Sequence, residues 1–192
     1  GRRVLEIGCG LGIVGLLCGK SGASSVVLSD YDGHALQGCQ QSIVINGLSD
    51  RVTTATLDWN TLSTTTLAAD QLRRVSPHGI DLVIGSDVLY MKEHGQLLGH
   101  GLKNLLVAAG PECQVILLCP HDRYGRDGFE ATLAESAIDS PDPLRNIRWT
   151  VTRLDNAGLA SGCCDLMYSM WLDRTVRGVE AHIRDPNSTS TG

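Results

Sequence analysis

The stretch VLEIGCGLGIVG, residues 4–15, decides the fold of this chain. Its first apolar residues, together with Arg3, predict a buried strand over Arg3–Ile7. Closely spaced glycines follow that strand, and a helical apolar pattern then runs over Gly12–Lys20. A strand that leads through a glycine turn into a helix is the first half of a strand–helix–strand unit. We therefore expect a parallel sheet with a ligand at the carboxyl end of this strand.

The glycines of this turn fit two ligand-binding patterns. The pattern G-x-G-x-x-G over residues 10–15, with Asp30 twenty residues after its first glycine, is typical of dinucleotide binding. The pattern E-x-G-x-G-x-G over residues 6–12 is typical of a loop whose nucleoside cofactor carries a sulfonium and no phosphate. Glu6 favours the second pattern, because a carboxylate beside a pyrophosphate would be electrostatically unfavourable. Beside a cationic cofactor, Glu6 would brace the loop amides and help to hold an ammonium group.

Apolar β-branched runs alternate with helical patterns along the rest of the chain, which is typical of a parallel sheet covered on both faces. The expected strands are Arg3–Ile7, Ser25–Ser29, Arg51–Leu57, Ile80–Gly85, Cys113–Cys119, Ile147–Arg153 and Leu166–Asp173. The expected helices are Gly12–Lys20, Gly33–Ile45, Leu67–Val75, His94–Ala108 and Gly125–Ile138.

The last two strands are joined by DNAGLASGCC, residues 155–164, which carries no helical pattern and predicts that one of the two runs antiparallel. We therefore expect a Rossmann-like α/β fold: a seven-stranded, mostly parallel sheet with helices on both faces and a C-terminal antiparallel hairpin strand. A dinucleotide dehydrogenase would repeat the nucleotide-binding half and add a substrate domain, for which the chain is too short. We predict one domain over residues 1–176 and a disordered tail over residues 177–192.

Composition excludes several function classes. The net charge of −5 and the pI of about 5.6 disfavour nucleic-acid binding, which needs a basic face. The seven cysteines form no C-x-x-C pair, so we predict no metal site and expect buried reduced thiols in a cytoplasmic protein, also present in the nucleus. No apolar run is long enough to span a bilayer, so we expect no membrane partner. We expect a monomer or a weak oligomer.

Polar residues at the ends of the second and third predicted strands suit an adenosine. Asp30 ends the run VVLSD, where a carboxylate accepts both ribose hydroxyls, and Tyr31 follows it at the same edge. In TLDWN, residues 56–60, we expect Asp58 to accept from the adenine amino group and Trp59 to pack on the purine. The alternative for this pair is a core tryptophan beside a turn aspartate.

The stretch DLVIGSDVLY, residues 81–90, predicts the acceptor side of the site. Ser86 is small enough to let backbone carbonyls reach the cofactor, and Asp87 and Tyr90 would face an incoming acceptor. A lysine must be attracted as an ammonium and then react as the neutral amine. A carboxylate attracts it, an aromatic rim accepts the alkylammonium, and desolvation lowers its pKa.

These motifs, in this order and with VILLCPHDRYGRDGFEATL at residues 115–133, resemble the eukaryotic seven-β-strand methyltransferase-like protein lysine methyltransferases. The resemblance covers about residues 1–173. It implies an S-adenosyl-L-methionine-dependent methyltransferase whose substrate is a lysine on an abundant protein such as a chaperone or translation factor. It also implies that Asp87 and Tyr90 lie on the acceptor side. The candidate cofactor-binding residues are Glu6, Gly8, Cys9, Gly10, Gly12, Asp30, Tyr31, Asp58, Trp59 and Ser86.

Two alternatives to lysine methylation remain open at this point. One is a different acceptor, either a protein histidine or a small molecule. The other is a non-catalytic scaffold that binds the cofactor. The family carries an upstream segment with a tryptophan that closes over the cofactor, and we expect this N-terminal cap segment to be missing from the chain.

Overall fold

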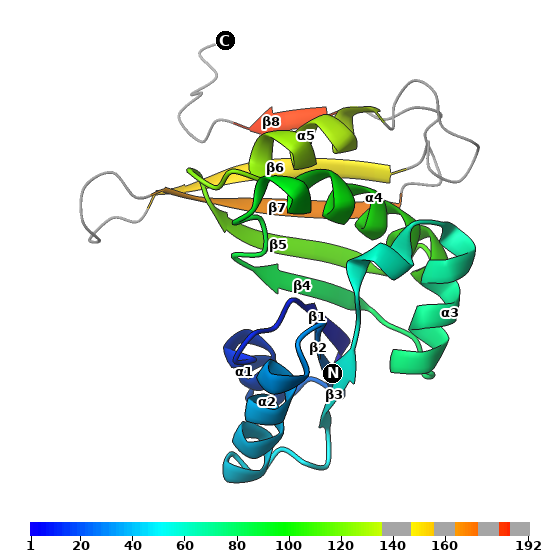
Figure 1. Ribbon diagram of the computed structural model, residues 1–192, viewed down its shortest axis with the longest axis vertical. Coiled ribbons are helices and arrows are strands. Elements are labelled where there is room, and N and C mark those ends of the chain that lie inside the picture. Colours follow the sequence, from blue (N-terminus) through cyan, green and yellow to red (C-terminus); the bar gives the residue numbers. More distant parts are fainter. Residues whose placement is uncertain (136–146, 156–163, 173–180, 185–192) are drawn as a thin grey trace.

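The computed structural model describes residues 1–135, 147–155, 164–172 and 181–184, which form one sheet with helices packed against it (Figure 1). Its strands are β1 Arg3–Ile7, β2 Ser25–Asp30, β3 Val52–Thr56, β4 Leu82–Ser86, β5 Gln114–Pro120, β6 Ile147–Asp155, β7 Cys164–Leu172 and β8 Ala181–Arg184. Its helices are α1 Ile13–Lys20, α2 Gly33–Ile45, the short 3-10 helix η1 Trp59–Leu62, α3 Thr65–Val75, α4 Lys92–Ala109 and α5 Arg126–Glu135.

The strand order β3-β2-β1-β4-β5-β7-β6-β8 places the topological switch between β1 and β4. The strands from β3 to β5 in that order are all parallel, whereas β7 is antiparallel to both β5 and β6. From β1 the chain winds outward in one direction and from β4 in the other, so the loops after these two strands diverge. This confirms the predicted fold class and places a cleft at the carboxyl ends of β1 and β4.

Alternate residues of the central strands enter two separate cores, one on each face of the sheet. Leu5 of β1 and Val83 of β4 belong to a core that also contains buried leucines of α4, including Leu102. Val4 and Ile84, their neighbours in sequence, pack on the opposite face with Cys39 and other residues of α2. The alternation follows from the period of two along a strand, and it confirms that helices cover both faces.

Several element bounds differ from the expectation by one or two residues, and three local differences have an identifiable structural cause. Residues 59–62 form η1, because Asp58 caps this segment by accepting a hydrogen bond from the backbone N–H of Asn60. The helix α3 begins two residues earlier than predicted, since the Thr64 side chain accepts from the N–H of Leu67. Finally, β8 pairs with β6 in parallel, so the described sheet has an eighth strand inside the segment predicted to be a disordered tail. The other tail residues lie outside the described ranges, and so do residues 156–163 of the predicted hairpin loop.

No helix in the described ranges is both long and apolar enough to cross a membrane.

Gly15 allows α1 to pack closely on the sheet. A Cβ at this position would lie 2.5 Å from Glu6 Oε2 and closer still to a methyl group of Leu28. We expect Gly15→Ala to lower the free energy of unfolding by about 1–3 kcal/mol in denaturant titrations, since the overpacked helix must shift. The control is Gly38→Ala in α2, where no atom lies within 4 Å of the added Cβ. We expect that control to be neutral or stabilising, because alanine favours a helix over glycine; an equal loss in both variants would contradict the packing role.

Candidate functional site

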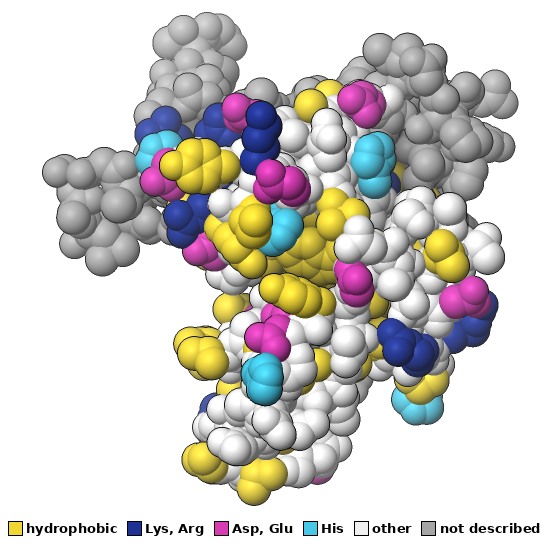
Figure 2. All heavy atoms as spheres, in the orientation of Figure 1, with side chains coloured by type: hydrophobic (Ala, Val, Ile, Leu, Met, Phe, Trp, Pro, Cys, Tyr) yellow, Lys and Arg dark blue, Asp and Glu magenta, His cyan; other side chains and the backbone are white. Residues whose placement is uncertain are grey.

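A cavity of about 350 Å³ opens at the carboxyl edge of the sheet, at the switch between β1 and β4. Figure 2 shows hydrophobic side chains gathered near the middle of the face in view, with acidic and histidine side chains around them. Eight predicted site residues lie in its wall: Gly8, Gly10, Asp30, Tyr31, Asp58, Trp59, Asp87 and Tyr90. The wall also contains Leu57, Asn60, Val88, His94 and Leu97, which the sequence interpretation did not include.

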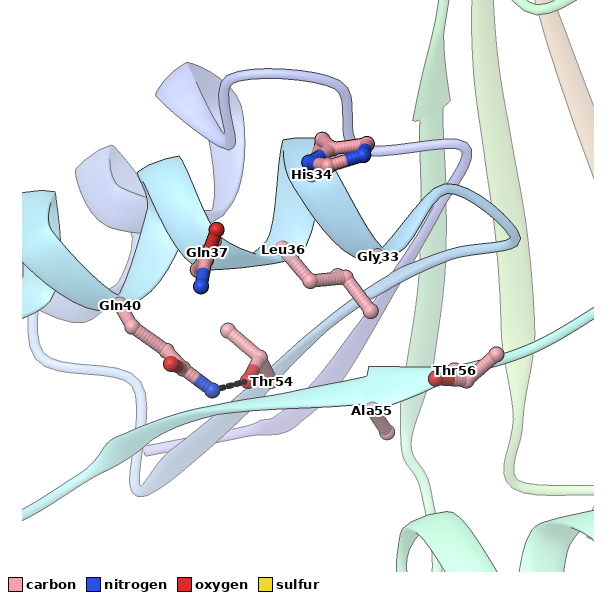
Figure 3. A pocket seen from close by; sticks show the side chains of 8 residues that line it. All are labelled: Gly33, His34, Leu36, Gln37, Gln40, Thr54, Ala55 and Thr56. Atoms are coloured by element: carbon pink, nitrogen blue, oxygen red, sulfur yellow. Dashed lines mark hydrogen bonds between the residues drawn. The ribbon is translucent and has the colours of Figure 1, made fainter.

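A second, larger groove of about 550 Å³ lies between α2 and β3 (Figure 3). Its wall contains Gln37, Gln40 and Thr54, and the side-chain amide of Gln40 donates to the Thr54 hydroxyl across 3.0 Å. None of the predicted site residues lies in this wall, and its wall has no carboxylate. The smaller cavity at the switch is therefore the candidate functional site.

The glycine loop after β1 has a backbone that side chains would not tolerate. Gly8, Gly10 and Gly12 have φ angles of 56°, 51° and 71°, in the left-handed region that favours glycine. A Cβ at Gly8 would lie 3.0 Å from the Trp59 ring, whereas a Cβ at Gly10 would meet no atom within 4 Å. The loop therefore packs closely on Trp59 and leaves open space above Gly10, where a ligand can approach the backbone.

Asp30 ties this loop to the end of β2. Its side chain is 7% exposed, and its Oδ2 accepts from the backbone N–H of Gly10 at 2.9 Å. Its Oδ1 accepts from the N–H of Asp32 at 3.0 Å. Each carboxylate oxygen has acceptor capacity beyond these single bonds, which leaves Asp30 able to accept from hydroxyl groups in the cavity.

Three aromatic rings from separate elements form one side of the cavity. The His94 ring in α4 meets the Trp59 ring in η1 edge to face, with centroids 5.3 Å apart. It meets the Tyr90 ring in the same way at 5.0 Å. Burial raises the pKa of Tyr90, which keeps its phenol protonated. The sequence analysis did not predict His94 as a site residue. The signal that could have found it is its position four residues after Tyr90, close to the start of α4.

Asp87 lies in the wall with an unusual backbone conformation and a bound guanidinium. Its φ of 56° is the single positive value among the described residues other than glycine. Arg123, in the loop between β5 and α5, donates from Nε to Oδ1 and from Nη2 to Oδ2, both at 2.6 Å. The sequence predicted Asp87 as a carboxylate facing the acceptor; the structure adds that both of its oxygens accept from an arginine.

Four predicted residues do not line the cavity. Glu6 is 3% exposed below the loop, where its Oε2 accepts from the N–H of Gly15 at 2.8 Å, so it braces the start of α1. The Cys9 thiol lies 3.9 Å from that of Cys39, away from the cavity. Gly12 is the N-cap of α1, and Ser86 is the last residue of β4. The proposed contact between Glu6 and a cofactor ammonium therefore has no support in this geometry.

The burial of Glu6 makes stability depend on pH. Burial raises its pKa from 4.5 to about 7, although the N–H of Gly15 opposes this shift. Between these two values the folded chain holds a proton that the unfolded chain has lost, so stability falls as pH rises from about 4.5 to about 7 and then levels off. The shift corresponds to at most about 3 kcal/mol.

We therefore expect Glu6→Gln to unfold at similar denaturant concentrations to the parent protein at pH 4.5 and at higher ones at pH 8. Glutamine keeps an oxygen that can accept from Gly15 and carries no charge. The matched control is Glu112→Gln, which replaces an exposed carboxylate. Equal changes in the two variants at pH 8 would contradict a buried ionisable Glu6.

Comparison with known proteins agrees with this geometry. The sequence pattern of a family described as lysine methyltransferase matches residues 1–131. The chain belongs to the lysine methyltransferase family. This confirms the resemblance drawn from the motifs, and the family pattern includes every residue of the cavity wall.

Two relatives of this chain are informative. Human protein-lysine N-methyltransferase EEF2KMT is 34% identical over 104 residues, which cover 48% of this chain and 29% of that protein. Mouse histone-arginine methyltransferase METTL23 is 36% identical over 95 residues, which cover 48% of this chain and 34% of that protein. The chain thus spans about a third or less of the length of these curated relatives.

Among solved structures, the fold is similar to that of an O-methyltransferase from Bacillus cereus in complex with SAH. The TM-score is 0.62 at 16% identity, and the match covers 90% of this chain and 74% of that one. At this identity the likeness establishes the methyltransferase fold.

Proposed function

We propose that this protein binds S-adenosyl-L-methionine in the cavity at the switch between β1 and β4 and transfers its methyl group to a lysine ε-amine of another protein. One observation carries the proposal: residues suited to bind a nucleoside and residues suited to receive a methyl acceptor line the same cavity. Asp30 ends β2, the glycine loop follows β1, and Asp87 and Tyr90 follow β4, yet all of them line one cavity. Family membership and the name of the human relative support lysine as the acceptor.

The residues present fit this cofactor. Asp30 has acceptor capacity for two ribose hydroxyls, and the open space above Gly10 admits a ligand close to the backbone. Trp59 offers an aromatic surface to the purine, and neighbouring Asp58 accepts at Oδ1 from Asn60 while its other oxygen can accept an adenine amino group. S-adenosyl-L-methionine would supply a methyl group activated on a sulfonium.

The protein's own groups would prepare the acceptor. Asp87 attracts the lysine ammonium to the rim, and the rings of Tyr90, His94 and Trp59 exclude water around its alkyl chain. Removal from water disfavours the ammonium form, so the ammonium releases a proton to solvent at the rim and exposes the lone pair that attacks. The remaining contribution is alignment, because the transfer is an in-line displacement.

The first test of this proposal is calorimetric titration with S-adenosyl-L-methionine and with NAD. Binding of the former alone supports the cofactor assignment, and binding of NAD alone contradicts it. The second test incubates the protein with methyl-labelled S-adenosyl-L-methionine and a cell extract, and locates the label by mass spectrometry. A methylated lysine supports the proposal.

The same labelling experiment separates the alternatives. Label on arginine would favour the activity named for METTL23, the second relative. Label on histidine or on a small molecule would favour another acceptor class. Cofactor binding without any label transfer would favour a non-catalytic scaffold. The proposed cytoplasmic or nuclear location is supported by the buried free thiols of Cys39, Cys113 and Cys119.

A further inference from the structure

The carboxylate of Asp87 is held from outside the cavity. The guanidinium of Arg123 binds both carboxylate oxygens in a fork at 2.6 Å, while the cavity wall includes Asp87 and not Arg123. A fork of two parallel hydrogen bonds fixes orientation as well as distance. The side chain of Asp87 therefore cannot rotate freely at the rim of the site.

The backbone around this pair is fixed from two directions. The N–H of Asp87 donates to Leu118 O at 2.8 Å, and the N–H of Gly125 donates to Leu89 O at 2.9 Å. A Cβ at Gly125 would lie 2.5 Å from Met91 O, so the two loops are in backbone contact. These contacts surround Asp87, whose φ of 56° lies in the left-handed region that residues other than glycine rarely adopt. A strained residue held in this way is a feature of functional sites.

Stability does not account for the ion pair. The side chains of Arg123 and Asp87 are 34% and 45% exposed, and a pair this accessible to water contributes little to the stability of the fold. The backbone contacts already join the two loops without it. What the pair does fix is the orientation of the Asp87 carboxylate at the cavity.

We propose that Arg123 is a positioning residue that acts on methyl transfer through Asp87. Its fork occupies one side of the carboxylate and leaves the remaining lone pairs for an amine in the cavity. Arg123 offsets part of the Asp87 charge, so the carboxylate still attracts the lysine nitrogen but favours its ammonium form less strongly than an unpaired carboxylate would. This inference rests on the proposed function, because it assigns Arg123 to the acceptor side of the same site.

A double-mutant cycle tests the inference, with methyl-labelled S-adenosyl-L-methionine and a cell extract as the probe. We expect Arg123→Gln to lower the rate of label transfer about tenfold or more, and Arg123→Lys to lie between it and the parent protein, since lysine keeps the charge and loses the fork. Affinity for S-adenosyl-L-methionine should stay within about twofold, and the melting temperature within a few degrees. In an Asp87→Asn background, Arg123→Gln should change the rate less than about twofold.

Arg126→Gln is the matched control, because Arg126, the first residue of α5, donates to His121 O in the loop that carries Arg123, whereas the bonds to the Asp87 carboxylate come from Arg123. We expect any change that Arg126→Gln causes in the rate to have the same factor with Asp87 and in the Asp87→Asn background. Equal factors for Arg123→Gln in both backgrounds, or a loss of cofactor affinity, would overturn the inference. The rate of label transfer by Asp87→Asn alone could be too low to measure above background. In that case, equal rates for Arg123→Lys and Arg123→Gln would overturn the inference. Rates that fall in the order parent protein, Arg123→Lys, Arg123→Gln would support it. No transfer by the parent protein would instead contradict the proposed function, and the inference would fall with it.

Discussion

Replacing Asp30 with alanine is expected to weaken binding of S-adenosyl-L-methionine at least about a hundredfold. A buried carboxylate that accepts from two hydroxyl groups contributes about 1.5–3 kcal/mol for each charged hydrogen bond. The same change removes the bond from the N–H of Gly10 at 2.9 Å, which ties the glycine loop to β2. The measurement is a calorimetric titration of each variant with the cofactor, at a temperature where thermal unfolding confirms that both are folded.

Asp32→Ala is the matched control for this variant. Asp32 lies two residues from Asp30, is exposed, and caps α2 by accepting from the N–H of His34. We expect a loss of about 1 kcal/mol in stability from the missing cap, with cofactor affinity nearly unchanged. Equal losses of affinity in the two variants would show that the negative charge of the region matters rather than the contacts of Asp30.

The second large effect is expected from Asp87→Asn, which should lower methyl transfer to protein at least about a hundredfold while cofactor affinity stays within about threefold. Asparagine keeps the shape of the side chain and tolerates the φ of 56° that alanine would tolerate poorly. It removes the charge that attracts the lysine ammonium and the second oxygen of the fork with Arg123. Label transfer to an extract and calorimetry with the cofactor measure the two properties separately.

The control for this second variant is Asp122→Asn, an exposed carboxylate in the loop that carries Arg123. We expect transfer within about twofold of the parent protein, because Asp122 is outside the cavity wall. A similar fall in both variants would assign the effect to the general charge of the rim. A parallel fall in cofactor affinity for Asp87→Asn would contradict the division between a cofactor side and an acceptor side.

The order of elements was predictable because it depends on local patterns. The apolar runs and the glycine turn predicted β1 and α1, and the non-helical segment after residue 155 predicted the antiparallel end of the sheet. The placement of Asp30, Trp59 and Asp87 at one edge followed from parallel strands, whose carboxyl ends lie together. Eight of the predicted site residues line the cavity for this reason.

The prediction that Glu6 braces the loop amides agrees with its bond to Gly15, but its sequence position did not reveal the direction of the side chain. Glu6 ends β1 as expected, but it points below the loop to Gly15. The η1 turn and the β8 strand were also missed, since the first depends on a capping contact of Asp58 and the second on pairing with a distant strand.

The sequence by itself determined the alternation of strands and helices, the glycine turn and the acidic residues at strand ends, because each depends on residues close together in the chain. Only the tertiary structure decided that Arg123 holds Asp87, across 36 positions, and that His94 joins Trp59 and Tyr90 in one wall. These contacts are long-range or cross an element boundary. They arise when packing of α4 and α5 on the sheet brings the loops together, and no local pattern encodes that geometry.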